Sequence, residues 1–322
     1  MSERRVDLEI AKLIGEPINY QLPVPVEIKA IANIETVEPG EKLWRYTNVD
    51  TDLDTILVVD TTDGKLIQVK RSPLGTTEIS FQGLNSKKEY VLVDAVLAST
   101  DTNVLGRKKD AIVRGMDKRE LKLILDGIEA NTNTPGNANT QSYTIVSGDD
   151  VYDAIMAIKH LVEDYGDGYV LLCGSAVKEA IDNYDKANAS TFNYNVTLTA
   201  KLRELGIEVV KIFGKVESTD GGGEQALLNT NHMILIAKNS RVAMGKPIWF
   251  VRRKINAEIA SMMGANVDDA QRAIMVGHVP EIVDFCGNSS NVLGFSVVGY
   301  ESIIFAIPNP KMIVTCDATS VV

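Results

Sequence analysis

At 322 residues, 45% hydrophobic and 24% charged, the sequence has the composition of a globular protein of two domains, or of one domain with large extensions, which excludes wholesale disorder. Its formal net charge of −10 excludes the strongly basic profile of a tight nucleic-acid binder, and its three widely spaced cysteines argue against a disulfide framework or a zinc site. No apolar run approaches the roughly 18 residues of a membrane span and the charged N-terminus lacks a signal-peptide core, so we expect a soluble cytosolic protein.

The N-terminal part predicts an arm followed by a β-rich excursion. Residues 4–14 have the pattern of a short amphipathic helix, whereas residues 16–27 hold three prolines and no clear period. From residue 43 to residue 97 the pattern changes to strands, which are expected at residues 55–60, 65–71, 76–81 and 89–97. Asp63-Gly64 is a hairpin signal between the first two. Because an isolated hairpin is marginal in water, we expect the body or another subunit to support it.

Residues 102–130 predict a single long helix, which would span about 40 Å at 1.5 Å per residue. The apolar residues at helical spacing are Leu105, Ile112, Met116 and Leu123. The cations of the polar face are Arg107, Lys108, Lys109, Arg114, Lys118, Arg119 and Lys122, diluted by Asp110, Asp117 and Glu120. Two interpretations stay open: a solvated face with ion pairs, or a basic face turned toward a polyanion.

After a linker at residues 131–141, the sequence predicts a compact α/β region. Helices are expected at residues 149–165, from Ser175 onward, and at residues 198–205. The run YVLLC at residues 169–173 is typical of a strand buried on both faces. Further strands are expected at residues 207–212 and 232–237, with a surface loop at residues 217–225 between them. The C-terminal strands are expected at residues 246–255, 271–283, 293–298, 303–307 and 311–316.

The strand–turn–helix around Gly174 and Ser175 is the strongest candidate for chemistry. A helix N-terminus after a buried strand can bind an anion, and Ser175 could act as a nucleophile. The sequence has neither a G-x-S-x-G elbow nor a G-x-G-x-x-G fingerprint there, so a plain helix-capping serine is favoured. The three histidines are isolated, and Cys173 lies in an apolar strand where a thiol is usually inert. We therefore predict no catalytic residue, cofactor or metal site.

The order of features is N-terminal arm, β-hairpin excursion, long basic helix, compact α/β unit and returning strands. Within this order stand the runs VYDAIMAIKHLVEDYGDGYVLLCGSAVKEAI, LRELGIEVVKI and HMILIAKNSRVAMG. The combination resembles the major capsid protein of tailed bacteriophages, with the Hong Kong 97-type fold. The resemblance covers nearly the whole chain, although it rests on an order of elements and not on a fixed motif.

The resemblance implies an α+β capsid fold of four parts. They are an N-terminal arm (residues 1–26), an extended β-hairpin loop (45–97), a peripheral domain (27–44, 98–143 and 243–292) with a spine helix at residues 102–130, and an axial α/β domain (144–242 and 293–322). About 100 residues precede the spine helix, so the resemblance implies that no scaffolding domain is fused to this chain and that any scaffold is a separate protein.

The function that the resemblance implies is structural. Copies of the chain would assemble as hexamers and pentamers into the icosahedral head shell of a tailed phage, and would enclose double-stranded DNA through weak, non-specific contacts. The implied location is the virion capsid, assembled in the host cytoplasm, with a portal and a separate scaffold or decoration protein as further partners. No membrane contact and no enzymatic activity are expected.

Two groups of residues are then candidates for a role in the shell. Expected subunit-interface residues in the hairpin are Thr55, Ile56, Val58, Lys65, Ile67, Lys70 and Arg71. Expected lumen-facing cations of the spine helix are Arg107, Lys108, Arg114, Lys118 and Lys122. Two alternatives remain: an encapsulin-like nanocompartment shell, which has the same fold, and a cytosolic α/β enzyme with a pocket near Gly174 and Ser175.

Overall fold

The computed structural model describes residues 26–47, 76–86, 89–92, 104–132, 140–144, 148–188, 197–218, 223–240, 245–255, 271–280 and 292–319. The predicted arm up to residue 25 and the predicted strands at residues 55–60 and 65–71 lie outside this part of the chain, and so do the seven expected interface residues. Among the described residues, no helix has both the length and the apolar character that crossing a bilayer requires.

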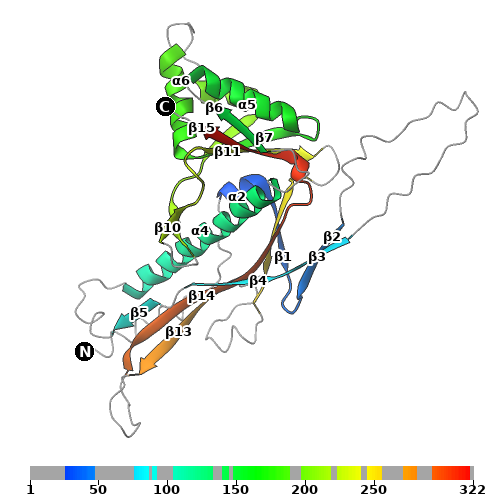
Figure 1. The fold of residues 1–322 in the computed structure, drawn as a ribbon. Helices are drawn as coiled ribbons and strands as arrows, with labels where there is room; N and C mark the ends of the chain where they lie inside the picture. The colour runs from blue at the N-terminus through cyan, green and yellow to red at the C-terminus, as the bar shows by residue number, and fades with distance from the viewer. Residues whose placement is uncertain are drawn as a thin grey trace, which may run out of the picture.

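Two sheets organise the described residues, and one long helix lies between them (Figure 1). This helix, α4 (Val104–Thr132), corresponds to the helix predicted over residues 102–130. The short helix α2 (Val26–Ile31) lies beside it. Ile31 of α2 and Ile124 of α4 are fully buried in one apolar cluster that includes residues of both sheets. Through this cluster, α4 joins the two sheets into one body.

The first sheet has five strands and carries three helices on one face. Its order is β6 (Thr140–Thr144), β15 (Ile313–Thr319), β11 (His232–Ser240), β7 (Gly166–Cys173) and β8 (Ile207–Lys211). The pairs β6–β15 and β7–β8 are parallel, whereas β11 is antiparallel to both of its neighbours. The covering helices are α5 (Gly148–Val162), α6 (Ser175–Asn188) and α7 (Leu198–Glu204). We call this sheet with its three helices the α/β unit.

The central strands of the α/β unit are buried on both faces. In β7, Leu171 and Cys173 pack with the residues of α5, α6 and α7, whereas Val170 and Leu172 pack in the cluster that contains α4. Successive side chains of a strand point to opposite faces, so a strand between two apolar layers needs a continuous apolar sequence. The prediction of a strand buried on both faces at the run YVLLC is therefore confirmed.

The second sheet is built around one long strand, β14 (Val292–Ala306). Its partners are β13 (Arg272–Pro280), β12 (Ile248–Arg253), β4 (Gln82–Asn85) and β5 (Glu89–Leu92), and β12 also pairs in parallel with β1 (Ala32–Val37). The prediction of two separate strands at residues 293–298 and 303–307 is wrong. Gly299 does not interrupt β14: it admits α4, because a Cβ there would lie 2.6 Å from Met116 Sδ and 2.7 Å from Ile112 Cγ2.

The C-terminal segment is shared between the two sheets. We predicted that residues 293–322 belong with the α/β unit, but β14 lies in the six-stranded sheet and only β15 lies in the five-stranded one. The change of sheet occurs at Pro308 and at the 3₁₀ turn η3 (Pro310–Met312). Proline has no N–H to donate to a ladder, so these residues end one strand before the next begins.

A separate two-stranded ribbon, β2 (Leu43–Thr47) and β3 (Thr76–Ser80), forms the base of the predicted excursion (Figure 1). Thr47 pairs directly with Thr76, so the chain leaves and re-enters the described body at adjacent positions. Trp44 is buried in a cluster with Val251 of β12 and Ile304 of β14, which anchors the ribbon on the six-stranded sheet. Its indole Nε1 donates a hydrogen bond to Glu35 Oε2 at 3.1 Å.

The two ends of the predicted surface loop at residues 217–225 belong to a second small hairpin. Strands β9 (Lys215–Glu217) and β10 (Glu224–Ala226) pair antiparallel. Leu227 and Leu228, which follow β10, are buried in the cluster that contains α4. The glycine-rich composition favours a loop. The two buried leucines hold the chain against α4, and a short hairpin forms directly before them.

Candidate functional site

The candidate anion site at the start of α6, which we ranked below a plain helix cap, already has two of its backbone amides in hydrogen bonds. The backbone amides of Ala176 and Val177, in the first turn of α6, donate to the carbonyl of Thr230 at 3.1 and 3.4 Å. A helix N-terminus binds an anion through its free amides, and here the chain itself accepts from them. Ser175 is exposed next to this contact. The pocket suggested near Gly174 and Ser175 relied on free amides at the start of α6, and two of these amides are occupied by the chain itself.

The remaining candidates for chemistry differ in their surroundings. Burial raises the pKa of the Cys173 thiol to about 12, so it is unreactive at neutral pH, as the apolar sequence predicts. His160 is exposed and lies 2.9 Å from Glu163, which directly follows the same helix. His232 contacts two carboxylates from different elements, a setting that no sequence pattern predicts. No group of three potential metal ligands occurs within the described ranges.

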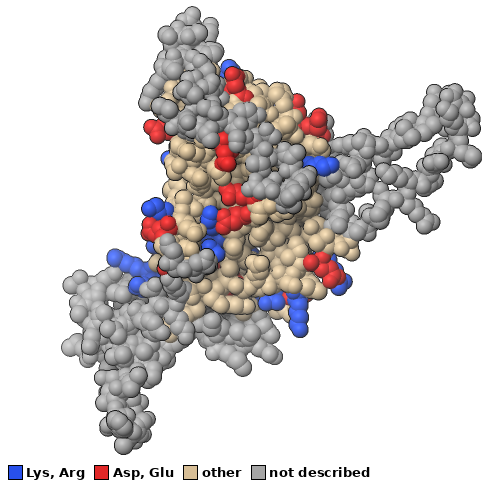
Figure 2. All heavy atoms as spheres, viewed as in Figure 1, with Lys and Arg blue, Asp and Glu red and all other residues tan. Residues whose placement is uncertain are grey.

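The basic face of α4 is only partly exposed. Arg107, Arg114 and Lys118 are exposed, Lys108 and Lys122 are half-buried, and Lys109, which we placed on the same face, is buried. Lys122 pairs with Asp126 at 2.7 Å. On the face drawn in Figure 2, basic and acidic side chains are interspersed and do not form one broad basic patch.

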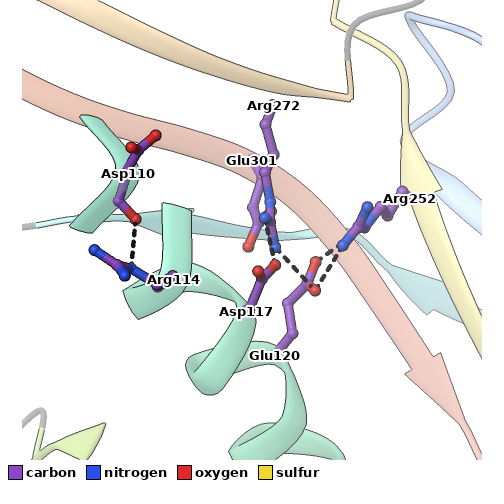
Figure 3. Close-up of polar contacts among 7 residues, drawn as sticks. All are labelled: Asp110, Arg114, Asp117, Glu120, Arg252, Arg272 and Glu301. Carbon is purple, nitrogen blue, oxygen red and sulfur yellow. Dashed lines mark hydrogen bonds and ion pairs between the residues drawn. The ribbon is translucent and has the colours of Figure 1, made fainter. Parts of the chain in front are cut away.

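The unusual feature of α4 is a cluster of buried charges between this helix and the six-stranded sheet (Figure 3). Glu120, which we placed on the solvated face, is fully buried. It accepts two parallel hydrogen bonds from Arg252 of β12: Nε to Oε1 at 2.9 Å and Nη2 to Oε2 at 2.7 Å. Paired geometry of this kind between a guanidinium and a carboxylate is strong and directional. It fixes both the height and the rotation of α4 over β12.

A second arginine, Arg272 of β13, lies at the centre of the same cluster (Figure 3). Its Nη2 is 2.9 Å from Glu120 Oε2, and its Nη1 donates to Asp117 Oδ1 at 2.6 Å. Its Nε donates to Glu301 of β14. Arg272 therefore ties together α4, β13 and β14. We call Asp117, Glu120, Arg252, Arg272 and Glu301 the charge cluster.

The charge cluster has an unbalanced charge when all its members are ionised. Its three carboxylates and two guanidiniums sum to one negative charge. Burial, and then the charge of Glu120, raise the pKa of Glu301 to about 7, against the opposing effect of Arg272. Burial would lower the pKa of Arg272, but Glu120, Glu301 and Asp117 raise it above its usual range. Oε1 of Glu301 has no hydrogen-bond partner within the described part of the chain, which fits a carboxyl that binds a proton easily.

The sequence does contain a signal for the buried glutamate. Glu120 follows Ile112 and Met116 at intervals of four residues and precedes Ile124 and Ile128 at the same interval. Residues four apart lie on one face of a helix, so Glu120 is in phase with the buried stripe. Its charged sequence neighbours hide this, and its partners are supplied by strands that lie far along the chain.

No protein-family model and no curated protein matches the sequence. Solved structures do match. The capsid of cyanophage P-SCSP1u has a TM-score of 0.56 at 10% identity, over 91% of this chain and 88% of that one. The mature capsid of bacteriophage PhiM1 has a TM-score of 0.52 at 10% identity, over 91% and 87%. The SrpI encapsulin of Synechococcus elongatus PCC 7942 has a TM-score of 0.51 at 11% identity, over 98% and 96%. The fold of this chain is thus the one predicted, the α+β, Hong Kong 97-type fold that phage capsids share with an encapsulin.

Proposed function

We propose that this protein is the major capsid protein of a tailed bacteriophage, whose copies assemble into an icosahedral shell around double-stranded DNA. The observation that carries the proposal is the fold match to two phage capsid structures over 91% of the chain. The role is structural and involves no catalysis. The expected location is the virion capsid, formed in the host cytoplasm.

The two sheets suggest how the chain is divided in such a shell. The α/β unit, with β6 and β15, corresponds to the axial domain, which gathers around the axis of each hexamer or pentamer. The six-stranded sheet, β14 included, and α4 correspond to the peripheral domain with its spine helix. The ribbon of β2 and β3 is the base of the extended loop. The pairing of Thr47 with Thr76 supports this assignment, because it brings both ends of residues 48–75 to one point.

The other partners of the proposed shell are DNA, a portal and a separate scaffold or decoration protein. For contact with DNA, the exposed cations of α4 are the relevant residues, above all Arg107, Arg114 and Lys118. With a net charge of −10 on the chain, such contact would be weak, non-specific and sensitive to salt. A triple substitution to glutamine should leave shell assembly intact and reduce the DNA retained per shell; unchanged retention would remove these residues from the proposal.

The assembly state tests the function directly. Purified protein should elute as capsomers or as megadalton shells, and negative-stain microscopy should show rings or closed particles. Interfaces repeated under closed symmetry can sum many modest contacts. A compact monomer that persists at high protein concentration would contradict the proposal.

A loop replacement separates folding from assembly. Replacing residues 54–71 with a short Gly/Ser linker leaves β2, β3 and both sheets in place, so the protomer should unfold cooperatively with little change in melting temperature. Higher assembly should fail, because the seven expected interface residues are removed. The matched control is Ile112→Asp, which places a charge in the contact of Ile112 with Met116 and Val297 and should give insoluble protein. Normal shells from the loop variant would show that the loop is not an assembly element.

An encapsulin-like nanocompartment is the second candidate. It is favoured by the extent of one match, which covers 98% of this chain and 96% of the SrpI encapsulin. The contents of isolated particles distinguish the two functions. A phage capsid should contain DNA that resists nuclease until the shell is opened, whereas a nanocompartment should contain a protein cargo at fixed stoichiometry.

A further inference from the structure

His232, at the start of β11, bridges the end of the long helix and the five-stranded sheet. Its Nδ1 lies 3.1 Å from Oε1 of Glu129, which is in the last turn of α4. Its Nε2 contacts Oδ1 of Asp317, the residue that pairs with it across β15. The His232 side chain is 23% exposed, and those of Glu129 and Asp317 are 31% and 48% exposed. Three elements therefore meet at one imidazole.

The geometry favours the protonated form of this imidazole. A neutral histidine has one N–H, whereas an ionised carboxylate can only accept hydrogen bonds. With both ring nitrogens on carboxylate oxygens, only the imidazolium form donates to Glu129 and Asp317 at once. Loss of one proton would leave a nitrogen lone pair facing a carboxylate, which repels it.

We propose that His232 is a pH-sensitive clamp, which fixes the C-terminal end of α4 to the α/β unit when protonated and releases it when neutral. Further from its C-terminal end, α4 is held by other means, namely the apolar cluster that includes Ile124 and Ile128, and the charge cluster. The clamp thus acts at the C-terminal end of the helix, where α4 meets the five-stranded sheet. It belongs to the protomer and does not depend on whether the protomer forms a shell.

The charges around His232 favour its protonated form. Facing it are Glu129 and Lys122 from α4, and Asp317 from β15. The hydrogen bond to Glu129 raises the pKa of His232 above 6.5, burial opposes this, and the charge of Asp317 adds to the increase; Lys122 opposes it weakly. The same hydrogen bond lowers the pKa of Glu129. A cation at a helix C-terminus also interacts favourably with the helix dipole.

The sign of the pH effect follows from these shifts. Because the folded-state pKa of His232 is raised, the clamp contributes stability that is complete below the ordinary histidine pKa. This contribution is lost as the pH rises through the raised value. A charge-assisted hydrogen bond of this kind corresponds to about a tenfold change in local opening.

Hydrogen–deuterium exchange of the full chain, corrected for the intrinsic effect of pH, tests the clamp. In the wild type, protection of residues 126–132 should be about tenfold greater near pH 6 than near pH 9. In His232→Gln, protection should be low at both pH values. Glu129→Gln keeps the size and an acceptor oxygen but removes the charge, so its loss of protection should occur at lower pH than in the wild type.

The matched control is His160→Gln. His160 also lies beside a glutamate, at 2.9 Å, but Glu163 directly follows α5, the helix that contains His160, so the pair joins nothing to the sheet. This variant should keep the wild-type pH dependence at residues 126–132. The clamp is refuted if wild-type protection there is independent of pH, or if His232→Gln and Glu129→Gln, folded by circular dichroism, both retain the full pH dependence.

Discussion

The α/β unit and the contact between α4 and the six-stranded sheet have different interiors. The α/β unit packs a continuous apolar cluster between its sheet and its three helices. The α4–sheet contact is interrupted: a small apolar patch around Ile112, Met116 and Val297 is followed along the helix by the charge cluster, and then by the apolar cluster of Ile124, which includes Phe250 of β12. Buried charged residues of the described chain gather on this second side, namely Glu120, Arg252, Arg272 and Glu301.

This difference separates stability from specificity. Apolar contacts are not directional and tolerate small shifts, so the α/β unit obtains its stability from buried area. Buried ion pairs bring little net stability, but a misplaced partner leaves a charge unpaired in the interior. The charge cluster therefore defines one position of α4 on the sheet and makes neighbouring positions of the helix unfavourable.

The largest effect is expected from removing the central carboxylate of the charge cluster. Glu120→Ala leaves Arg252 and Arg272 buried without their shared partner, and should reduce the free energy of unfolding by about 3–5 kcal/mol. Urea unfolding of the unassembled protein, followed by circular dichroism, measures this. Asp117→Asn is the control: its side chain is 29% exposed and it contacts Arg272 alone, so its loss should be about 1 kcal/mol or less. Equal losses for the two variants would contradict the central role of Glu120.

A cavity in the α/β unit should have a slightly smaller effect. Leu235 is fully buried in the apolar cluster of this unit, and Leu235→Ala should reduce the free energy of unfolding by about 3 kcal/mol. The loss should be the same from acid to neutral pH, because no buried charge belongs to that cluster among the described residues. A pH-dependent loss would show that the two interiors are not independent.

Within the charge cluster, a pH dependence should come from Glu301. Its pKa of about 7 in the folded chain is above the ordinary 4.5, so the folded state holds its proton more tightly than the unfolded state. Stability should therefore fall, by an amount on the order of 1–3 kcal/mol, as the pH rises from the ordinary value through the raised one. Urea unfolding across this range should show a flatter profile for Glu301→Gln. A profile as steep as that of the wild type would assign the proton to another group.

The smallest effect expected here concerns the close approach of α4 to β14. In Gly299→Ala, the new methyl group would meet Met116 and Ile112 at under 3 Å, and the helix must move away. The flexible end of Met116 can relieve part of this, so we expect a loss of about 1–2 kcal/mol. Gly83→Ala is a matched control, since its Cβ would meet only Tyr300 at 3.7 Å. Thermal unfolding should distinguish the two variants.

The elements whose sequence pattern reflects their own packing were predictable. The apolar residues of α5 recur at helical spacing, and the run YVLLC is continuously apolar. Each of these local patterns predicts its element, and the structure contains both elements. The capsid-like fold was predictable from the order of the elements. The continuity of β14 was not predictable. A glycine within a strand pattern usually indicates a break, and the packing role of Gly299 becomes visible only once α4 lies above it.

The charge cluster and the His232 contact were missed because their members come from distant parts of the chain. Glu120 stands in the run DKRELK, which is typical of a solvated helix face. Its burial depends on Arg252, 132 residues away, so local sequence cannot reveal it. His232 is an isolated histidine until the fold brings Glu129 and Asp317 to its two nitrogens. Contacts between distant charges are set by tertiary pairing, for which a single sequence carries no periodic signal.

The junction at the base of the ribbon has an optical consequence. The chain has two tryptophans, Trp44 in β2 and Trp249 in β12, and their ring centroids are 5.6 Å apart. Fluorescence excited in the indole absorption band therefore comes almost wholly from the junction of the β2–β3 ribbon with the six-stranded sheet. The α/β unit contributes almost none of it. A change of emission wavelength or intensity when protomers associate would show that the ribbon base moves during association, in unlabelled protein and in real time.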